Sequence, residues 1–334
     1  MNMLESIYWR KLQSALLQLL TIFQKIDYYK NLLFLLISMK WVLFILGFEY
    51  HYNHHIKDWK KNVVEALNEK ENIKEISEFA LHIARIINYP NLSVDGHIKQ
   101  IEEMGEELKR KIKTPKGMRP THIIEGFNEF FFMDKKFQPN VNDYYNPNNN
   151  YLNVVLEKKT GIPITLSIIY IHLASFLNFE LQPVNFPSHF LVKYTLDKES
   201  KEYIIIDPFN KGRIMDDYIL QDLLNKVNPK LSISVSNSIL EKASTSQILI
   251  RLLNNLKIGY IEVDDLQKIE LINEMILSLD RFNPEAIRDK GMILYRYKKF
   301  KESLQNFYQY VELNPEAEDI DKILELIRQI RNTM

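Results

Sequence analysis

Two side chains that could do acid–base chemistry stand at the ends of short apolar runs. His189 begins the run 189–194, and Asp207 ends the run 203–207. Val, Ile, Phe and Tyr dominate both runs, which favours strands. Ahead of them lies an apolar stretch entered through Gly161-Ile162-Pro163. A helix start, a strand His and a strand-end Asp are the parts of a thiol acyl-transfer site, yet the chain has no cysteine.

The elements that must position these residues begin with a helix. The segment 164–177 is apolar on nearly all sides, so we expect a buried helix there. Pro163 suits its first turn, because a missing N–H costs nothing at that position. The preceding loop, 143–150, is dense in Asn and Pro, which favour turns and helix caps. We expect Asn150 to cap a short helix that Gly161 ends.

Strands follow this helix. Their composition and the turn residues between them predict strands at 184–186, 190–194, 203–206 and 213–215. The polar run 197–202 suits a hairpin tip. A hairpin centred there would bring His189 and Asp207 together across two antiparallel strands.

Composition bounds the function classes. The 334 residues are enough for two or three domains. Lys+Arg and Asp+Glu are both 43, so no net charge favours nucleic acid or an anionic membrane. The absence of cysteine excludes a disulfide framework and a thiolate metal site, and it fits a reducing compartment. No phosphate-binding loop, dinucleotide fingerprint or zinc spacing is present, so we predict no cofactor and no metal.

The N-terminal region contains an apolar stretch, 32–48, with one charge at Lys40. A membrane span needs about 20 apolar residues, and a central Lys costs ~2.5–3.5 kcal/mol on insertion scales. We therefore expect this stretch not to anchor the protein. A natural start at Met39 or later is an alternative that stays open.

The C-terminal third is helical in period and holds an internal repeat. Asn283-Pro284-Glu285-Ala286 recurs as Asn314-Pro315-Glu316-Ala317, and each copy follows an apolar helical stripe. A helix pair every ~34 residues with Pro at the boundary is typical of tetratricopeptide repeats. Two copies are few for a free-standing array, so we expect it to pack on the preceding domain.

A series of motifs, in order along the chain, resembles the SirB1 family of bacterial proteins. They are Asp143-Tyr144-Tyr145-Asn146-Pro147, 150–157, 160–166, Asn185-Phe186-Pro187, His189-Phe190-Leu191-Val192, Asp207-Pro208-Phe209-Asn210, 251–257 and Arg288-Asp289-Lys290-Gly291. The resemblance implies a transglutaminase-like core followed by tetratricopeptide-like helices, and a related module occurs in a eukaryotic F-box protein. Where family members tend to have Gly before the His and paired Gly after the Asn, this chain has Ser188 and Lys211-Gly212.

The resemblance also implies where a nucleophile would stand. In transglutaminase-like enzymes the Cys begins the buried helix, where the helix dipole and a His stabilise the thiolate. That position falls near Pro163 in this chain, and Pro has no nucleophile. The nearest hydroxyls, Thr165 and Ser167, are displaced by about 100° per residue around the helix. Either would also need a base within ~2.6–3.2 Å.

Three interpretations of His189 and Asp207 remain open. The one we favour for the pair itself is an inter-strand hydrogen bond that closes the sheet. The second is a His–Asp pair kept in a cleft that binds an extended peptide without cutting it. The third is a hydrolase or acyl-transfer site with Thr165 or Ser167 as the nucleophile. The candidates for ligand or partner binding are Tyr145, Asn150, Tyr151, Asn153, His189, Asp207 and Asn210.

We therefore predict a mostly helical α+β protein with a degenerate transglutaminase-like core, a small antiparallel sheet and tetratricopeptide-like repeats. The expected domains are an N-terminal extension at 1–60, the core at 61–240 with a helical lead-in at 61–135, and the repeats at 241–334. The predicted function is that of a cytoplasmic, non-catalytic binding or adaptor protein for a protein or peptide partner. The alternative is a hydrolase or acyl-transfer enzyme.

Overall fold

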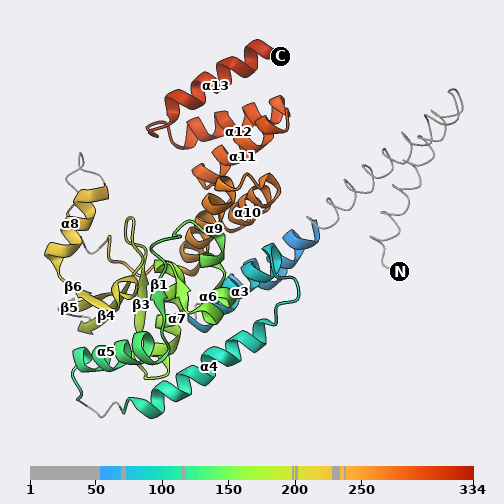
Figure 1. The fold of residues 1–334 in the computed structure, drawn as a ribbon. Coiled ribbons are helices and arrows are strands. Elements are labelled where there is room, and N and C mark those ends of the chain that lie inside the picture. Colours follow the sequence, from blue (N-terminus) through green and yellow to red (C-terminus); the bar gives the residue numbers. More distant parts are fainter. Residues whose placement is uncertain are drawn as a thin grey trace, which may run out of the picture. The chain divides into compact units, whose positions relative to one another are not determined.

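The structure is a computed structural model that describes residues 53–68, 73–113, 117–197, 199, 202–227, 234–236 and 238–334. The chain divides into two compact units, Met1–His55 and Ile56–Met334, and the second carries the elements that follow. The apolar segment 32–48 lies outside the described residues. Among the helices that the structure describes, none is long and apolar enough to cross a membrane. The predicted fold class is confirmed, because helices predominate and the sheets are small (Figure 1).

The lead-in to the core is helical. Its elements are η1 (Lys60–Val64), η2 (Ala66–Asn68), α3 (Ile73–Ile87), α4 (Val94–Lys111), α5 (Pro120–Asn128) and η3 (Glu129–Asp134). Ser93 caps α4, because its side chain accepts a hydrogen bond from the N–H of Gly96 at 3.1 Å. Pro120 stands in the first turn of α5, where it breaks no helical hydrogen bond. The apolar stripe of α3 is buried against α4 and α7.

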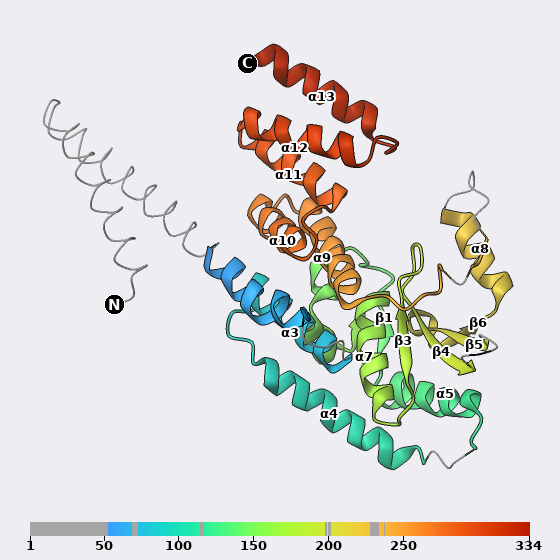
Figure 2. The same ribbon diagram turned by 180° about the vertical axis from the view of Figure 1, so that it is seen from behind.

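The centre of the core is α7, which begins with Pro163 as predicted. The elements here are β1 (Gln138–Pro139), η4 (Pro147–Asn150), α6 (Leu152–Lys158), β2 (Thr160–Gly161) and α7 (Pro163–Ser175). Every residue of α7 from Pro163 to Ala174 is buried, which confirms the buried helix. It lies between α3 and α4 on one side and the antiparallel β-sheet on the other (Figure 2).

Two local predictions near α7 are wrong. Asn150 ends η4 instead of capping α6, whose N-cap residue is Tyr151 without a side-chain bond. The turn that ends α6 is made by Lys159, which takes the left-handed conformation at φ 56°. Gly161 serves close packing instead, because a Cβ there would lie 2.8 Å from Thr165 Oγ1.

The sheet is a four-stranded antiparallel meander in the order β3-β4-β5-β6. Its strands are β3 (Leu181–Val184), β4 (Leu191–Asp197), β5 (Glu202–Asp207) and β6 (Arg213–Met215). Val192 pairs with Ile206 and Lys193 with Ile205 in the central hairpin. The helix α7 packs against β3 and β4, and also against η5 (Pro208–Asn210). A second apolar cluster joins the sheet to α8 (Asp217–Val227) through Leu191, Ile205 and Leu220.

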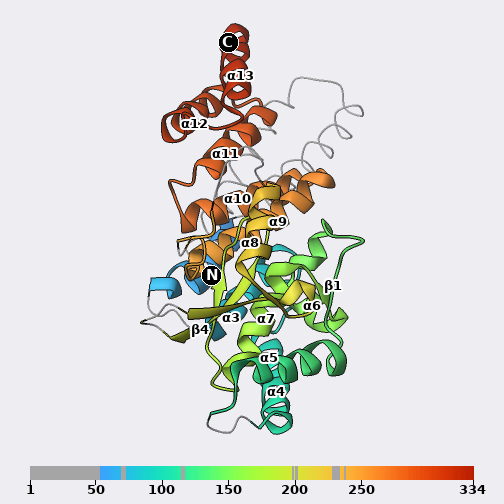
Figure 3. The same ribbon diagram turned by 90° about the vertical axis from the view of Figure 1, so that its left-hand side faces the viewer.

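Helical repeats form the rest of the unit. They are α9 (Thr245–Glu262), α10 (Leu266–Leu279), α11 (Pro284–Arg296), α12 (Phe300–Leu313) and α13 (Ile320–Thr333), which succeed one another up to the C-terminus (Figure 3). The two Asn-Pro-Glu-Ala copies differ in structure. Asn283 caps α11 by accepting from the N–H of Ala286 at 3.0 Å, whereas Asn314 ends α12. Between Asn314 and α13 the chain turns through Asp319, which is held by Arg288 and Tyr310.

The array packs on the core, as expected for so few repeats. Trp59 is fully buried, and its indole N–H donates to the carbonyl of Met275 at 3.2 Å and to Ser278 Oγ at 2.7 Å. On α9, Gly259 lies so close to the loop before η4 that a Cβ would be 2.8 Å from the Tyr145 carbonyl oxygen. The first repeat helix is therefore part of the core packing as well as of the array.

Candidate functional site

His189 stands in the turn between β3 and β4, two residues before the strand it was predicted to open. Ser188 takes the left-handed conformation at φ 59°, and the N–H of His189 donates to the Phe186 carbonyl at 3.1 Å. The imidazole is half-buried, and Ser188 Oγ lies 3.0 Å from its Nδ1. A tight turn with a positive φ before the His accounts for the Gly that related sequences favour at this position. Here a Ser adopts that backbone and adds a polar contact to the ring.

Asp207 is fully buried at the end of β5, and its carboxylate is occupied by its own neighbours. Oδ1 accepts from the N–H groups of Phe209 at 2.9 Å and Asn210 at 3.2 Å. Oδ2 accepts from the side-chain amide of Asn210 at 2.5 Å. Asp207 therefore caps the short helix η5, and the predicted ligand candidate Asn210 spends its amide on this cap.

The favoured interpretation of the pair, an inter-strand hydrogen bond, is not what the structure contains. The described contacts of Asp207 are with residues 209 and 210, and the polar contact of the His189 ring is with Ser188. The register explains this, because Val192 opposite Ile206 puts His189 beyond Asp207 along the hairpin. The pair still interacts through charge. Burial lowers the pKa of His189, Asp207 opposes that effect and Arg251 adds to it, so the ring is neutral at pH 7.

Neither candidate hydroxyl is placed to act as a nucleophile. Thr165 is fully buried, accepts from the N–H of Ile162 at 3.1 Å and donates to the Asn149 carbonyl at 2.9 Å. Ser167 is also fully buried and donates to the Phe190 carbonyl at 3.2 Å. These bonds fix the start of α7 and its contact with β4. Both hydroxyls donate to backbone carbonyls, and neither contacts the His189 ring among the described residues.

Two residues that we did not choose from the sequence complete the surroundings of His189. Arg251, on α9, donates from Nη1 to the side-chain oxygen of Asn185 and lies 5.6 Å from the centre of the Phe190 ring. Tyr144 packs edge-on against Phe209 at 6.1 Å, and burial raises its pKa while the charge of Arg251 opposes that rise. Arg251 is the first residue of the motif 251–257, which contributed to the family resemblance. That motif was the only sign in the sequence that Arg251 could belong to the site.

We call the group formed by Tyr144, His189, Asp207, Phe209 and Arg251 the His189 cluster. It gathers the loop before η4, the turn before β4, the end of β5 with η5, and the first repeat helix α9. It offers a neutral imidazole, a guanidinium and two aromatic rings, while its one carboxylate is used for capping. Such a set can bind a polar ligand through hydrogen bonds and aromatic contacts.

The remaining ligand candidates separate into exposed and buried residues. Tyr145 is 65% exposed beside Tyr144, with ring centres 5.4 Å apart. Tyr151 is fully buried and shares a hydroxyl contact with Tyr260, which makes it a packing residue. Asn150 and Asn153 are also buried, and the side-chain oxygen of each has no hydrogen-bond partner in the structure.

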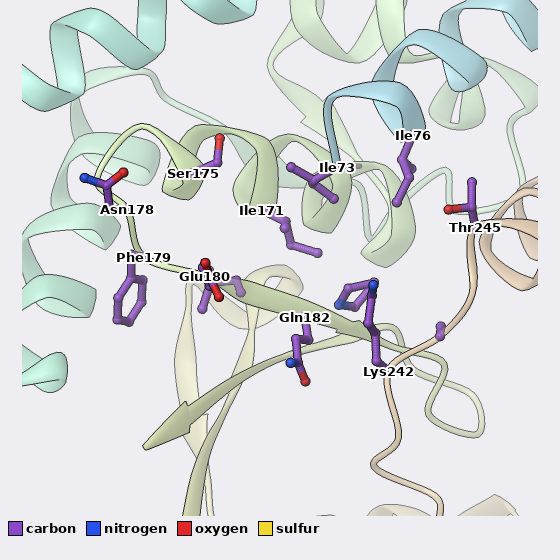
Figure 4. Close-up of a pocket in the computed structure, with 13 residues that line it drawn as sticks. Ile73, Ile76, Ile171, Ser175, Asn178, Phe179, Glu180, Gln182, Lys242 and Thr245 are labelled. Atoms are coloured by element: carbon purple, nitrogen blue, oxygen red, sulfur yellow. The ribbon is translucent and has the colours of Figure 1, made fainter. Parts of the chain in front are cut away.

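Two cavities among the described residues are lined by residues other than these candidates. One of about 450 Å³ lies between α3, α7, β3 and the segment before α9, with Ile73 and Ile171 on the helical side and Gln182 and Lys242 opposite (Figure 4). A second, of about 440 Å³, lies within the repeats. Among the described residues, no group of three or more His, Asp or Glu side chains could hold a metal ion.

Comparison with known proteins agrees with these observations. Residues 96–254 match the transglutaminase-like superfamily, and residues 256–328 match the tetratricopeptide repeat, so the two matches meet inside α9. A UPF0162 protein of Xylella fastidiosa is 30% identical over 249 residues, which cover 73% of this chain and 85% of the relative. Protein SirB1 of Salmonella typhimurium is 24% identical over 248 residues, covering 74% and 87%. These matches confirm the resemblance drawn from the motifs.

A shorter similarity links the chain to a eukaryotic protein. Human F-box only protein 21 is 40% identical over 98 residues, which are 28% of this chain and 16% of the relative. No solved structure matches the chain.

Proposed function

Because the chain belongs to the family of transglutaminase-like proteins that includes SirB1 and UPF0162, we propose that it is a non-catalytic binding protein for a protein or peptide partner. In this proposal the His189 cluster contacts the partner, and the tetratricopeptide-like array supplies a second surface. Tetratricopeptide repeats generally mediate interactions between proteins, which supports the role given to the array.

One observation carries the non-catalytic part of the proposal. The start of α7, where a thiol enzyme would hold its nucleophile, is Pro163, and the hydroxyls of Thr165 and Ser167 are buried in bonds to backbone groups. A Ser or Thr nucleophile needs a base within hydrogen-bond reach. This arrangement supports a core that keeps the transglutaminase-like fold but no longer catalyses acyl transfer.

The second surface is a groove within the repeats, which we call the repeat groove. It is lined by apolar side chains of α9, α10, α11 and α13, including Ile261, Ile269, Met292 and Ile323. Charged groups at the same groove include Arg288 and Lys322. An apolar floor with polar groups around it is the usual composition of a binding site.

The two surfaces share one helix. Arg251 of α9 belongs to the His189 cluster, and Ile261 of α9 lines the repeat groove. Inside the array, Lys257 of α9 pairs with Asp289 at 2.6 Å and reaches Asn273 at 3.2 Å, with only 5% of the Lys257 side chain exposed. The ion pair links α9 to α11, and the hydrogen bond to Asn273 links α9 to α10, so both surfaces are attached to the same helix.

The non-catalytic part is tested with purified protein and panels of acyl, amide and peptide substrates, together with hydroxyl-directed activity probes. We expect no turnover and no covalent labelling. Labelling at Thr165 or Ser167 that disappears in a His189→Ala protein would overturn the proposal and favour the hydrolase or acyl-transfer alternative.

The binding part is tested with an array of short fluorescein-labelled peptides, whose affinities are then measured by fluorescence anisotropy. His189→Ala and Met292→Glu should each weaken binding, the first at the cluster and the second at the groove. Arg110→Gln is the control, because Arg110 is exposed on α4 and remote in sequence from both surfaces. Peptides that bind all four proteins equally would contradict the assignment of these surfaces.

The proposal extends to location and domains. We place the protein in the bacterial cytoplasm, which is supported by the bacterial source of the relatives that match most of the chain. Cell fractionation tests this location. The domain boundaries after residues 60 and 240 stay proposals, and limited proteolysis with mass spectrometry would locate them.

A further inference from the structure

Arg251 is a half-buried cation with only neutral partners among the described residues. Its Nη1 donates to the side-chain oxygen of Asn185 and to the Phe186 carbonyl, the latter at 2.9 Å. No described carboxylate forms an ion pair with it. Burial lowers the pKa of Arg251, and the nearby Tyr144 only partly opposes this effect. The chain thus keeps a positive charge partly out of water without the anion that normally accompanies a buried charge.

Arg288 shows how the same chain treats another half-buried guanidinium. Its Nε and Nη2 donate to Asp289, and its Nη1 donates to Asp319 at 2.9 Å. Burial lowers the pKa of Arg288, but the two carboxylates outweigh burial and raise it. Arg288 is paired within the fold, so the unpaired state of Arg251 is a local property of the His189 cluster.

The hydrogen bonds of Arg251 leave one edge of its guanidinium group, with Nε and Nη2, for a ligand. A guanidinium has five N–H donors in a plane, and the described bonds of Arg251 use Nη1 only. Nε and Nη2 are the pair that binds a carboxylate through two parallel hydrogen bonds. Asp207 does not take this place, because its oxygens accept from residues 209 and 210. The Phe190 ring lies 5.6 Å from the guanidinium and supports it from one side.

We propose that Arg251 receives a carboxylate of the bound peptide, so that the His189 cluster selects peptides carrying an acidic side chain or a free C-terminus there. This inference rests on the proposed function, and it names the chemistry that the partner must bring. A carboxylate fits better than a phosphate group, because the cluster holds one cation beside a neutral imidazole, which matches a single negative charge. Tyr144 and Phe209 provide aromatic contact for the neighbouring part of the peptide.

The test uses short fluorescein-labelled peptides that bind the wild-type full chain, each made in matched forms. One form has a free C-terminal carboxylate, one has a C-terminal amide, and others exchange each Asp for Asn or each Glu for Gln. We expect loss of the relevant carboxylate to weaken binding about 10- to 100-fold, the range for a charge-assisted bidentate bond. The amidated peptides test a C-terminal carboxylate, and the Asn and Gln peptides test an acidic side chain. This comparison uses wild-type protein only.

Variants then locate the effect. Arg251→Gln should bind the carboxylate and amide forms equally weakly, Arg251→Lys should retain part of the discrimination through its charge, and Arg110→Gln should behave as wild type. Thermal unfolding checks that each variant is folded. Peptides that bind wild type without preferring a carboxylate, or a preference that survives in Arg251→Gln, would overturn this inference and leave the proposed function intact. Failure of every peptide to bind would contradict both.

Discussion

The hydroxyl groups of Tyr151 and Tyr260 lie 2.5 Å apart, and this buried contact joins the transglutaminase-like core to the first repeat helix. Tyr151 stands at the start of α6, and Tyr260 is near the end of α9. Burial raises the pKa of Tyr151, with Tyr260 adding to the rise, so the Tyr151 hydroxyl keeps its proton. It makes α9 a shared element of the core and the array.

We predict that Tyr260→Phe lowers the free energy of unfolding by ~1–3 kcal/mol, because it leaves the buried Tyr151 hydroxyl unpaired. Tyr151→Phe should lower it by less, because Lys268 Nζ still donates to the Tyr260 hydroxyl at 3.4 Å. The double variant should lose less than the sum of the two, since it leaves neither partner unsatisfied. Urea unfolding followed by circular dichroism measures the three values. If the loss in the double variant equalled the sum of the two single losses, the hydroxyl contact would contribute nothing to the packing of α9 on the core.

A second prediction concerns the close approach at Gly259. Gly259→Ala would put a Cβ 2.8 Å from the Tyr145 carbonyl oxygen, and overpacking of this kind costs ~1–3 kcal/mol. Gly126→Ala is the matched control within α5, because its Cβ would meet Ile112 Cδ1 at an ordinary 3.4 Å. The control should be neutral or slightly stabilising, since Ala favours helices over Gly. Equal melting temperatures for the two variants would contradict the close packing of α9 on the loop.

The third prediction reverses an expectation drawn from the sequence. A His189–Asp207 hydrogen bond would make His189→Ala leave a buried carboxylate without its partner. Because Asp207 is satisfied by the N–H groups of Phe209 and Asn210, we now expect His189→Ala to change stability by less than ~1 kcal/mol.

Asp207→Ala is the companion measurement. It removes the cap of η5 and should cost ~2 kcal/mol, at the upper end of the range for a lost cap. Both variants are compared with wild type by urea unfolding. A greater loss in His189→Ala than in Asp207→Ala would restore the direct pair as the structural bond.

The fourth prediction is a dependence of stability on pH. Burial lowers the pKa of His172 from 6.5 to about 4, while the buried Ser77 hydroxyl lies 2.8 Å from its Nδ1. Between pH 6.5 and 4 the unfolded state binds more protons than the folded state, so the free energy of unfolding falls as the pH falls through this window. For a group this buried the loss is of the order of 3 kcal/mol.

His172→Asn tests this dependence, because Asn can still bond Ser77 and does not titrate. We expect the variant to be less stable at pH 7 and to lose less stability between pH 7 and 4 than wild type does. His82, whose pKa is lowered to about 4 chiefly by burial, keeps part of the dependence in the variant. An unchanged slope would assign the acid sensitivity to other groups.

Short-range features of the fold were predictable from the sequence. Pro163 and the apolar run after it predicted α7, and the apolar runs separated by polar turns predicted β4, β5 and β6. The strand predicted at 184–186 is misplaced, because β3 is Leu181–Val184. The repeat of Asn-Pro-Glu-Ala predicted the array, although Asn314 ends a helix where Asn283 begins one. Such patterns work because helix and strand formation follow the spacing of apolar residues within a few turns of the chain.

The residues that form the site were harder to predict from the sequence. The absence of cysteine and the position of Pro163 were visible in the sequence, and together they predicted a core without a thiol. The partners of His189 and Asp207 were not, because hairpin register and the turn at Ser188 decide which atoms meet. Arg251 comes from a helix assigned to the repeats, and no local spacing relates it to His189.

The sequence by itself determined the class of fold, the order of its parts and the absence of a thiol, since each depends on residue type, motif order or local periodicity. Tertiary structure alone decided that Asp207 caps η5, that Thr165 and Ser167 serve the backbone, and that Arg251 completes the cluster. The physical reason is that a buried polar group must be satisfied by whichever partner the packing brings within hydrogen-bond reach. Long-range packing, which the spacing of residues does not encode, selects that partner.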